Sequence, residues 1–129
     1  MKTEKKLSGE CLCGKVSWQM NGPYEFFGMC QCSRCRKVTG AAFATNIFVK
    51  PEQFSWLLGQ HDRGEFSLPL PNTFGNAFCK NCGSRVPRQT SRGWILAPLG
   101  STMGLPSIKP TLVCPEDHTE WFTELGKII

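Results

Sequence analysis

The sequence predicts a mainly β domain, built from short strands and tied together by bound metal, and three observations predict this class. The chain has 129 residues, 40% of them hydrophobic, which is enough for the core of one compact domain. Thirteen Gly and nine Pro predict many turns and few long helices. Eight Cys, in a chain with no sign of secretion, favour metal ligands or reactive thiols over a disulfide framework.

The start of the chain bears on where the protein works. Residues 1–8 are polar and basic, and no apolar stretch follows them, so the sequence indicates no signal peptide. No run approaches the roughly 20 apolar residues of a membrane span. We therefore expect a cytoplasmic protein without membrane association, with a single domain over residues 1–129 in which residues 1–6 are loose.

Alternation and turn residues predict the elements of the first half. Val16, Trp18 and Met20 alternate with polar neighbours, which is typical of a half-buried strand, and the turn over residues 21–23 ends it. Residues 33–39 suit one or two helical turns ending at Gly40. Other apolar or alternating segments predict strands over residues 24–29, 43–49 and 54–58, with a break over residues 51–53.

The second half continues with short strands. Residues 61–65 form a polar loop, and Pro69 gives the following strand an edge position. A loop over residues 104–110 precedes the last strand, and a terminal turn or short helix falls within residues 116–125. The strands expected here cover residues 66–70, 74–78, 86–89, 94–96 and 111–113.

Two cysteine pairs predict a structural zinc site. Cys79 and Cys82, followed by Gly83, have the spacing of a zinc knuckle, in which a tight turn directs both sulfurs at one ion. Cys11 and Cys13 are two residues apart and, in an extended segment, would direct both side chains to one face. Together the pairs supply the four ligands of a closed tetrahedral site that contributes to folding. The alternative is four free buried thiols.

The middle cysteine group is different in kind. Cys30, Cys32 and Cys35 offer three thiolates, which can hold one zinc and leave a fourth position open, as catalytic zinc sites do. Three thiolates make such a zinc a weak Lewis acid, which favours thiol exchange over water activation. Neighbouring cations would lower the thiol pKa values and attract a carboxylate, and they are Arg34, Arg36 and Lys37.

Two other interpretations of this group remain open. It could be a second structural site, completed by Cys114, His61 or His118. It could also be a metal-free redox trio, although no βαβ context of the thioredoxin kind surrounds it. Four large aromatic residues are expected in the core, although any of them could line a shallow pocket beside this group: Phe43, Trp56, Trp94 and Trp121.

The motifs together resemble the glutathione-dependent formaldehyde-activating enzyme family, which includes the centromere protein V-like domains. The resemblance extends from about Leu7 to Trp121, and seven cysteines fall in the family's order and spacing. The matching motifs are Gly9-x-Cys11-x-Cys13-Gly14-x-Val16, Cys30-x-Cys32-Ser33-x-Cys35-Arg36 with Gly40 and Phe43, and Phe78-Cys79-x-x-Cys82-Gly83.

The resemblance implies an Mss4-like fold of small coiled β-sheets. It implies a structural zinc on Cys11, Cys13, Cys79 and Cys82, and a second zinc on Cys30, Cys32 and Cys35 beside the active site. The implied activity is that of a carbon–sulfur lyase working in the synthetic direction, which joins glutathione to formaldehyde as S-hydroxymethylglutathione. Arg34 and Arg36 would then bind the carboxylates of the glutathione.

The sequence departs from the family pattern at several positions. Leu12 and Gln31 stand where similar sequences usually have histidine, although neither position is a ligand in the family. Residues 111–113 replace a segment that tends to carry a histidine, and His118 lies closer to Trp121. The change over residues 111–113 leaves that segment without the histidine that would serve as acid or base near the C-terminus in the family.

A second class of function is a zinc-stabilised module that binds protein or nucleic acid without catalysis. The net charge of +5 allows an anionic partner. Lys and Arg are scattered, however, without the basic and aromatic stripe of single-strand binders, so we expect no nucleic acid partner. Binding that weakens steeply with salt would favour the module, and saturable glutathione binding would favour the enzyme.

Overall fold

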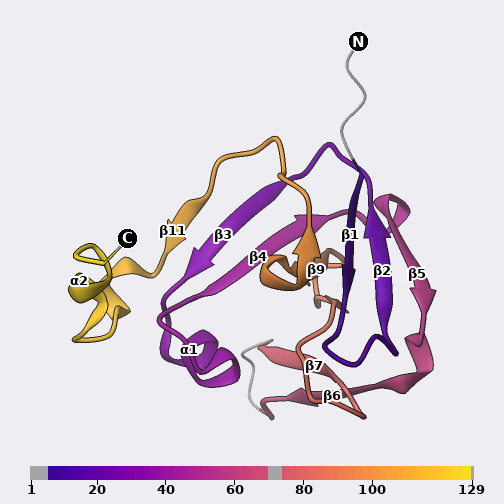
Figure 1. Ribbon diagram of the computed structural model, residues 1–129, viewed down its shortest axis with the longest axis horizontal. Helices are drawn as coiled ribbons and strands as arrows, with labels where there is room; N and C mark the ends of the chain where they lie inside the picture. Colours follow the sequence, from indigo (N-terminus) through magenta and orange to yellow (C-terminus); the bar gives the residue numbers. More distant parts are fainter. Residues whose placement is uncertain (1–5, 70–73, 129) are drawn as a thin grey trace.

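The protein consists of three small β-sheets and two short helices in a computed structural model that describes residues 6–69 and 74–128 (Figure 1). The mainly β class predicted from the sequence is confirmed. Residues 1–5 of the expected loose segment, and Leu70 at the end of one expected strand, lie outside the described residues.

The first sheet has four strands in the order β10-β1-β2-β5, all antiparallel. Trp18 and Met20 of β2 are fully buried beside Leu7 of β1, as the alternation predicts for β2. The sequence analysis missed β1, because it has one apolar side chain in four; it forms because it pairs with β2 along its whole length. The strands are β1 (Leu7–Glu10), β2 (Ser17–Met20), β5 (Phe54–Leu58) and β10 (Thr102–Met103).

The second sheet has five strands in the order β11-β3-β4-β9-β8, with β11 parallel to β3 and the other pairs antiparallel. Its central strand β4 is buried on both faces. Ile47 and Val49 face the core, while Asn46 and Phe48 occupy the opposite face. The strands are β3 (Phe26–Cys30), β4 (Ala44–Val49), β8 (Arg88–Gln89), β9 (Ile95–Pro98) and β11 (Thr111–Val113).

The third sheet is a hairpin of β6 (Arg63–Ser67) and β7 (Gly75–Cys79). The polar loop expected over residues 61–65 is therefore wrong for its second half. Arg63, Gly64 and Glu65 pair with β7 although none of them is apolar, because this edge strand needs no apolar face of its own. The paired strand also begins earlier than the residues 66–70 expected from the sequence.

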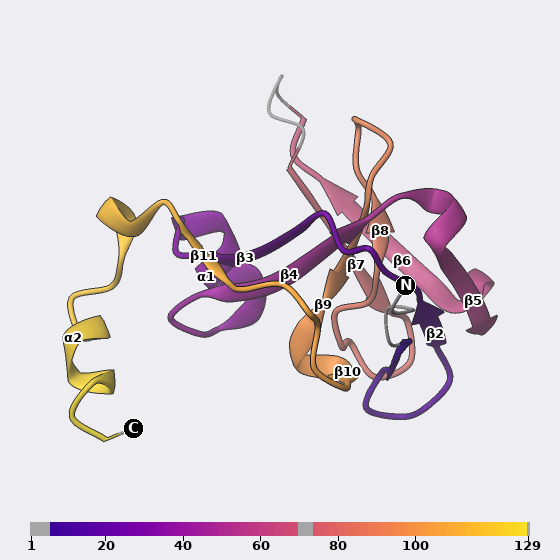
Figure 2. The same ribbon diagram turned by 90° about the horizontal axis from the view of Figure 1, so that it is seen from above.

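The helix α1 (Ser33–Thr39) follows β3 and ends at Gly40, as the sequence predicts. Gly40 has a φ of 63°, and its backbone N–H donates to the carbonyl oxygen of Arg36. Figures 1 and 2 both place α1 where β3 ends and β4 begins, with the C-terminal segment and α2 (Phe122–Leu125) at the outer side of the molecule.

The buried core is shared by all three sheets. It includes Trp18 of β2, Ile47 of β4, Ala77 of β7 and Ala97 of β9. Trp56 packs against this core, as expected, but Trp121 has 51% of its surface exposed and is not a core residue. No helix in the described part of the chain is long and apolar enough to cross a membrane.

Candidate metal centres and the adjoining pocket

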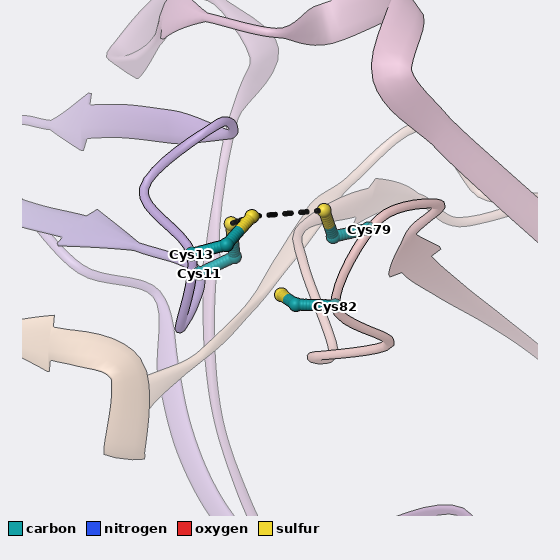
Figure 3. Close-up of side chains that lie close together, drawn as sticks. All are labelled: Cys11, Cys13, Cys79 and Cys82. Carbon is teal, nitrogen blue, oxygen red and sulfur yellow. Dashed lines mark hydrogen bonds between the residues drawn. The ribbon is translucent and has the colours of Figure 1, made fainter.

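Two turns from distant parts of the chain bring four cysteine sulfurs together (Figure 3). One turn follows β1 and holds Cys11 and Cys13. The other begins at Cys79, the last residue of β7, and holds Cys82. The first pair lies in a turn, closed by a bond from the Gly14 N–H to the Cys11 carbonyl oxygen, rather than in the extended segment assumed from the sequence. Both pairs direct their sulfurs into the space between the turns.

The knuckle turn has the backbone that its glycine predicts. Gly83 has a φ of 79°, and its N–H donates to the carbonyl oxygen of Cys79 at 2.8 Å. The N–H of Cys79 in turn donates to the carbonyl oxygen of Ser84 at 2.9 Å. This closed turn fixes the two cysteines of the knuckle relative to each other.

The spacing of the four sulfurs fits a tetrahedral zinc site. Their Sγ atoms all lie within 4.8 Å of one another, with 3.6 Å between Cys11 and Cys13 and 3.8 Å between Cys13 and Cys79. A tetrahedron with Zn–S bonds of about 2.3 Å has S···S edges of about 3.8 Å. The donor set therefore matches the size and the soft ligands that zinc requires.

Local hydrogen bonds stabilise thiolates in this group. The Ser84 hydroxyl and backbone lower the pKa of Cys82 to about 5. The side chain of Asn81 lowers the pKa of Cys13. Burial raises the pKa of Cys11, although its sulfur accepts a bond from the Val16 N–H at 3.3 Å. Zinc binds thiolates, so these hydrogen bonds favour the metal-binding form of Cys13 and Cys82.

The second group of sulfurs lies where β3 meets α1. Cys30 is the last residue of β3, Cys32 is the N-cap of α1, and Cys35 lies in the first turn of the helix. The three Sγ atoms also lie within 4.8 Å of one another. The Cys32 sulfur accepts from the Cys35 N–H at 3.4 Å, so one thiol both caps the helix and joins the group.

Two of these thiols, Cys32 and Cys35, differ in how readily they ionise. Burial raises the pKa of Cys35 well above its usual value, and the adjacent Cys30 adds to this effect. Burial also opposes ionisation of Cys32, but hydrogen bonds from the Cys35 backbone and from the neighbouring thiols lower its pKa. Cys32 therefore ionises more readily than Cys35. A metal cation bound to all three sulfurs would replace the proton held at Cys35.

A chamber of about 210 Å³ opens directly onto this second group. We call it the inner chamber. Its floor is one face of the five-stranded sheet, and its remaining wall comes from the start of β7 and from the residues after the knuckle. The lining residues other than the three cysteines are Phe26, Gly28, Asn46, Phe48, Phe74, Gly75, Arg85, Arg88, Leu96 and Val113.

A wider pocket of about 620 Å³ shares several walls with the inner chamber, including Phe48 and Arg88. We call it the outer pocket. It gains Arg34 from α1, and Arg92 and Trp94 from the β8–β9 turn. The lining thus contains three arginines, Arg34, Arg88 and Arg92, and one carboxylate, that of Glu25. A carboxylate oxygen of Glu25 lies 3.9 Å from Lys50 Nζ. The outer pocket therefore favours anionic groups.

The structure separates the two arginines singled out from the sequence. Arg34 lines the outer pocket, whereas Arg36 donates through Nε to the carbonyl oxygen of Gln31 and lines a different hollow of about 450 Å³. His118 lines that same hollow, with its Nδ1 at 2.7 Å from the Thr119 carbonyl oxygen.

The candidates for a fourth ligand do not join the second group in the described part of the chain. His61 lies in an exposed turn, and His118 lines the separate hollow. Cys114 follows β11, where its pKa is raised first by burial and then by the nearby Cys30 and Cys32. Its Sγ groups with Glu116 and Asp117, both exposed, and not with the three thiols.

Sequence reasoning missed several residues of the two cavities. Arg85 donates through Nε to Asn76 Oδ1 at 2.9 Å and through a terminal nitrogen to Asn46 Oδ1 at 3.3 Å. A signal for Arg85 was present, because it follows Cys82 by three residues and the knuckle fixes its position. Asn46, Phe48 and Leu96 gave no such signal, since each reads as an ordinary strand residue until the sheet order is known.

Comparison with known proteins adds three findings. The family model described as glutathione-dependent formaldehyde-activating enzyme matches residues 6–116. A crystal structure of a Rhodobacter sphaeroides protein is similar in fold, with a TM-score of 0.62 and 18% sequence identity over 80% of this chain and 97% of that chain. A comparison with curated proteins finds no match.

Proposed function

The chain belongs to the glutathione-dependent formaldehyde-activating enzyme family, and from this premise we propose that it joins the thiol of glutathione to formaldehyde at the Cys30, Cys32 and Cys35 group. In reaction class this is a carbon–sulfur lyase working in the synthetic direction, with S-hydroxymethylglutathione as product. We place it in a reducing compartment such as the cytoplasm, because it needs its cysteines as free thiols.

One observation carries this proposal: the three-cysteine group opens into a chamber, whereas the four-cysteine group does not line any described cavity. A closed tetrahedral site serves folding, and a three-ligand site with space beside it serves chemistry. We therefore propose that the four-cysteine group holds a structural zinc and that Cys30, Cys32 and Cys35 hold a second, functional zinc. When bound there, zinc would favour the thiolate form of a substrate thiol.

The arginines of the outer pocket would hold the body of the glutathione. Glutathione carries two carboxylates, and guanidinium groups bind carboxylates with paired hydrogen bonds. Arg34, Arg88 and Arg92 come from α1, β8 and the β8–β9 turn, and all three line the same pocket. We propose that Arg34 binds one carboxylate of glutathione and that Arg92 binds the other. Arg36 lies elsewhere and is not part of this proposal.

Anchoring the two ends of glutathione directs its thiol toward the inner chamber. Phe48 and Arg88 line both cavities, so the outer pocket adjoins the inner chamber, and we propose that a ligand anchored in the first reaches the cysteine group in the second. Fixing the thiol beside the aldehyde removes much of the entropy cost of a bimolecular reaction, which can be worth several kcal/mol. The apolar walls exclude water that would otherwise hydrate the aldehyde.

The experiment that tests this proposal is exchange NMR of glutathione and formaldehyde with the purified zinc-loaded protein. We expect the protein to accelerate formation of S-hydroxymethylglutathione, and Cys32→Ser to abolish the acceleration. Cys114→Ser is the matched control, because it changes a nearby cysteine outside the three-thiol group. Equal rates of S-hydroxymethylglutathione formation with and without the wild-type protein would refute the proposed activity.

A further inference from the structure

The floor of the inner chamber is built from residues that face one another across neighbouring strands. Phe26 of β3 pairs with Phe48 of β4, and Phe48 pairs with Leu96 of β9. Two residues further along β3, Gly28 pairs with Asn46, and two residues beyond that, Cys30 pairs with Val113 of β11. The cysteine group therefore lies at one end of an apolar floor that the sheet itself holds rigid.

Gly28 leaves the middle of this floor open. A Cβ at this position would lie 2.8 Å from the ring of Phe26 and 3.4 Å from a Val113 methyl group. Any other residue would therefore push its side chain between two walls of the chamber. With glycine here, the space above the floor stays free for a ligand.

The chamber is larger than formaldehyde needs. Its volume is about 210 Å³, whereas a dry apolar cavity of about 150 Å³ already holds benzene. Formaldehyde has only two heavy atoms and would leave most of the apolar wall without a partner. The chamber has room for a group the size of an aromatic ring together with the thiol sulfur that attacks the aldehyde carbon.

Arg85 is a fixed cationic group in this largely apolar chamber, whose lining also includes Arg88 and Asn46. It is held by Asn46 of β4 and Asn76 of β7, and no described Asp or Glu forms an ion pair with it. These two bonds use two of the five guanidinium N–H donors, which leaves donors for a ligand oxygen. Asp and Glu are also absent from the described lining of the chamber.

We propose that the inner chamber binds an apolar aldehyde, aryl or branched alkyl, with its carbonyl oxygen on the Arg85 guanidinium and its carbon facing the cysteine group. This inference rests on the proposed function, and it extends the substrate class of the same site from formaldehyde to larger apolar aldehydes. An apolar body suits this chamber because five of the lining side chains are aliphatic or aromatic: Phe26, Phe48, Phe74, Leu96 and Val113.

The chemistry balances without a further reactant. The thiol sulfur forms a bond to the carbonyl carbon, and the π electron pair moves onto the oxygen. The proton lost by the thiol ends on that oxygen, so the product is a hemithioacetal and nothing is oxidised or reduced. Arg85 would stabilise the negative charge that develops on the oxygen, as preorganised donors do in an oxyanion hole.

The test uses two unreactive probes and the zinc-loaded protein. Benzamide carries a ring and a carbonyl oxygen, and formamide carries the oxygen alone. Isothermal titration calorimetry should give a dissociation constant for benzamide at least tenfold below that for formamide. Exchange NMR with glutathione should likewise show faster addition to 4-nitrobenzaldehyde than to formaldehyde at equal concentration, relative to the uncatalysed rates.

Two variants on β11 test whether benzamide binds in the inner chamber. Val113→Phe adds volume inside the chamber and should weaken benzamide binding at least tenfold. Leu112→Phe also introduces a phenyl ring on the same strand, at a position that does not line the chamber and is 50% exposed, and should leave benzamide binding unchanged. Equal weakening by both variants, or none by Val113→Phe, overturns the inference.

A third variant tests the oxygen contact. Arg85→Gln should weaken benzamide binding at least fivefold while binding of benzene, which has no oxygen, is retained. If Arg85→Gln fails to fold, the β11 pair still decides the proposal. A protein that accelerates glutathione addition to formaldehyde but binds benzamide no tighter than formamide overturns this inference alone. A protein that binds benzamide but accelerates neither addition overturns the proposed function and the aldehyde assignment together.

Discussion

Gly9 shows how one residue position limits the packing of the core. A Cβ at Gly9 would clash with the ring of Trp18, which is fully buried. The indole can lie against the β1 backbone only because this residue has no side chain. The sequence shows Gly9 and Trp18, but it does not show that the two are register partners across β1 and β2.

We expect Gly9→Ala to lower the free energy of unfolding by about 1–3 kcal/mol, because the added methyl overpacks the core. Urea denaturation followed by circular dichroism measures this. Gly100→Ala is the matched control, since a Cβ there meets nothing within 4 Å, and it should change stability by less than about 0.5 kcal/mol. Similar losses in both variants would show that Trp18 does not pack as described.

Arg92 is the residue of the outer pocket whose effect on substrate binding is easiest to isolate, because it lies in the β8–β9 turn, outside the sheet core. Arg92→Gln should raise the KM for glutathione about three- to tenfold and leave kcat within a factor of two, since a carboxylate anchor binds substrate and transition state alike. Lys109→Gln removes one exposed charge outside both cavities and should leave KM unchanged. An unchanged KM for Arg92→Gln would remove it from the glutathione site.

At the scale of elements, the short helix α1 depends on a cysteine as its N-cap. The Cys32 sulfur accepts from the Cys35 N–H, a position at which serine and threonine are usually preferred. The sequence predicts the helix and its end at Gly40, but not this cap, because cysteine is not a typical capping residue. The same side chain therefore links the start of α1 to the candidate functional site.

Two substitutions of Cys32 separate these roles. Cys32→Ser and Cys32→Ala both remove the thiolate, but the serine hydroxyl can still cap α1. We expect Cys32→Ala to be less stable than Cys32→Ser by about 0.5–2 kcal/mol in urea denaturation, with both variants equally depleted of zinc. Equal stability of the two would mean that the Cys32 cap contributes nothing to α1.

The two turns of the four-cysteine group join β1 to β7, elements that lie more than sixty residues apart in the chain. A metal that closes so long a loop contributes its binding energy to folding. Cys79→Ser should therefore unfold the protein or lower its melting temperature far more than Cys32→Ser does. Thermal unfolding by circular dichroism compares the two, and a smaller loss for Cys79→Ser would contradict the structural role.

For the whole molecule, local patterns predicted which cysteines lie together but not the cavities. Cysteine spacing predicted both sulfur groups, because each motif is short and its geometry is local. The inner chamber could not be predicted, because it depends on the sheet order β11-β3-β4-β9-β8, which places Val113, Cys30 and Asn46 on one face. β6 was misplaced for the same reason, since its pairing with β7 rather than its own residues defines it.

The central claim is that the two cysteine groups are separate metal sites, one for folding and one for chemistry. The most direct test is the zinc-to-protein ratio of wild type and Cys32→Ser, measured by inductively coupled plasma mass spectrometry, with circular dichroism as the check on folding. The account predicts two zinc ions per wild-type chain and one per folded Cys32→Ser chain. One zinc per chain in both proteins would contradict it.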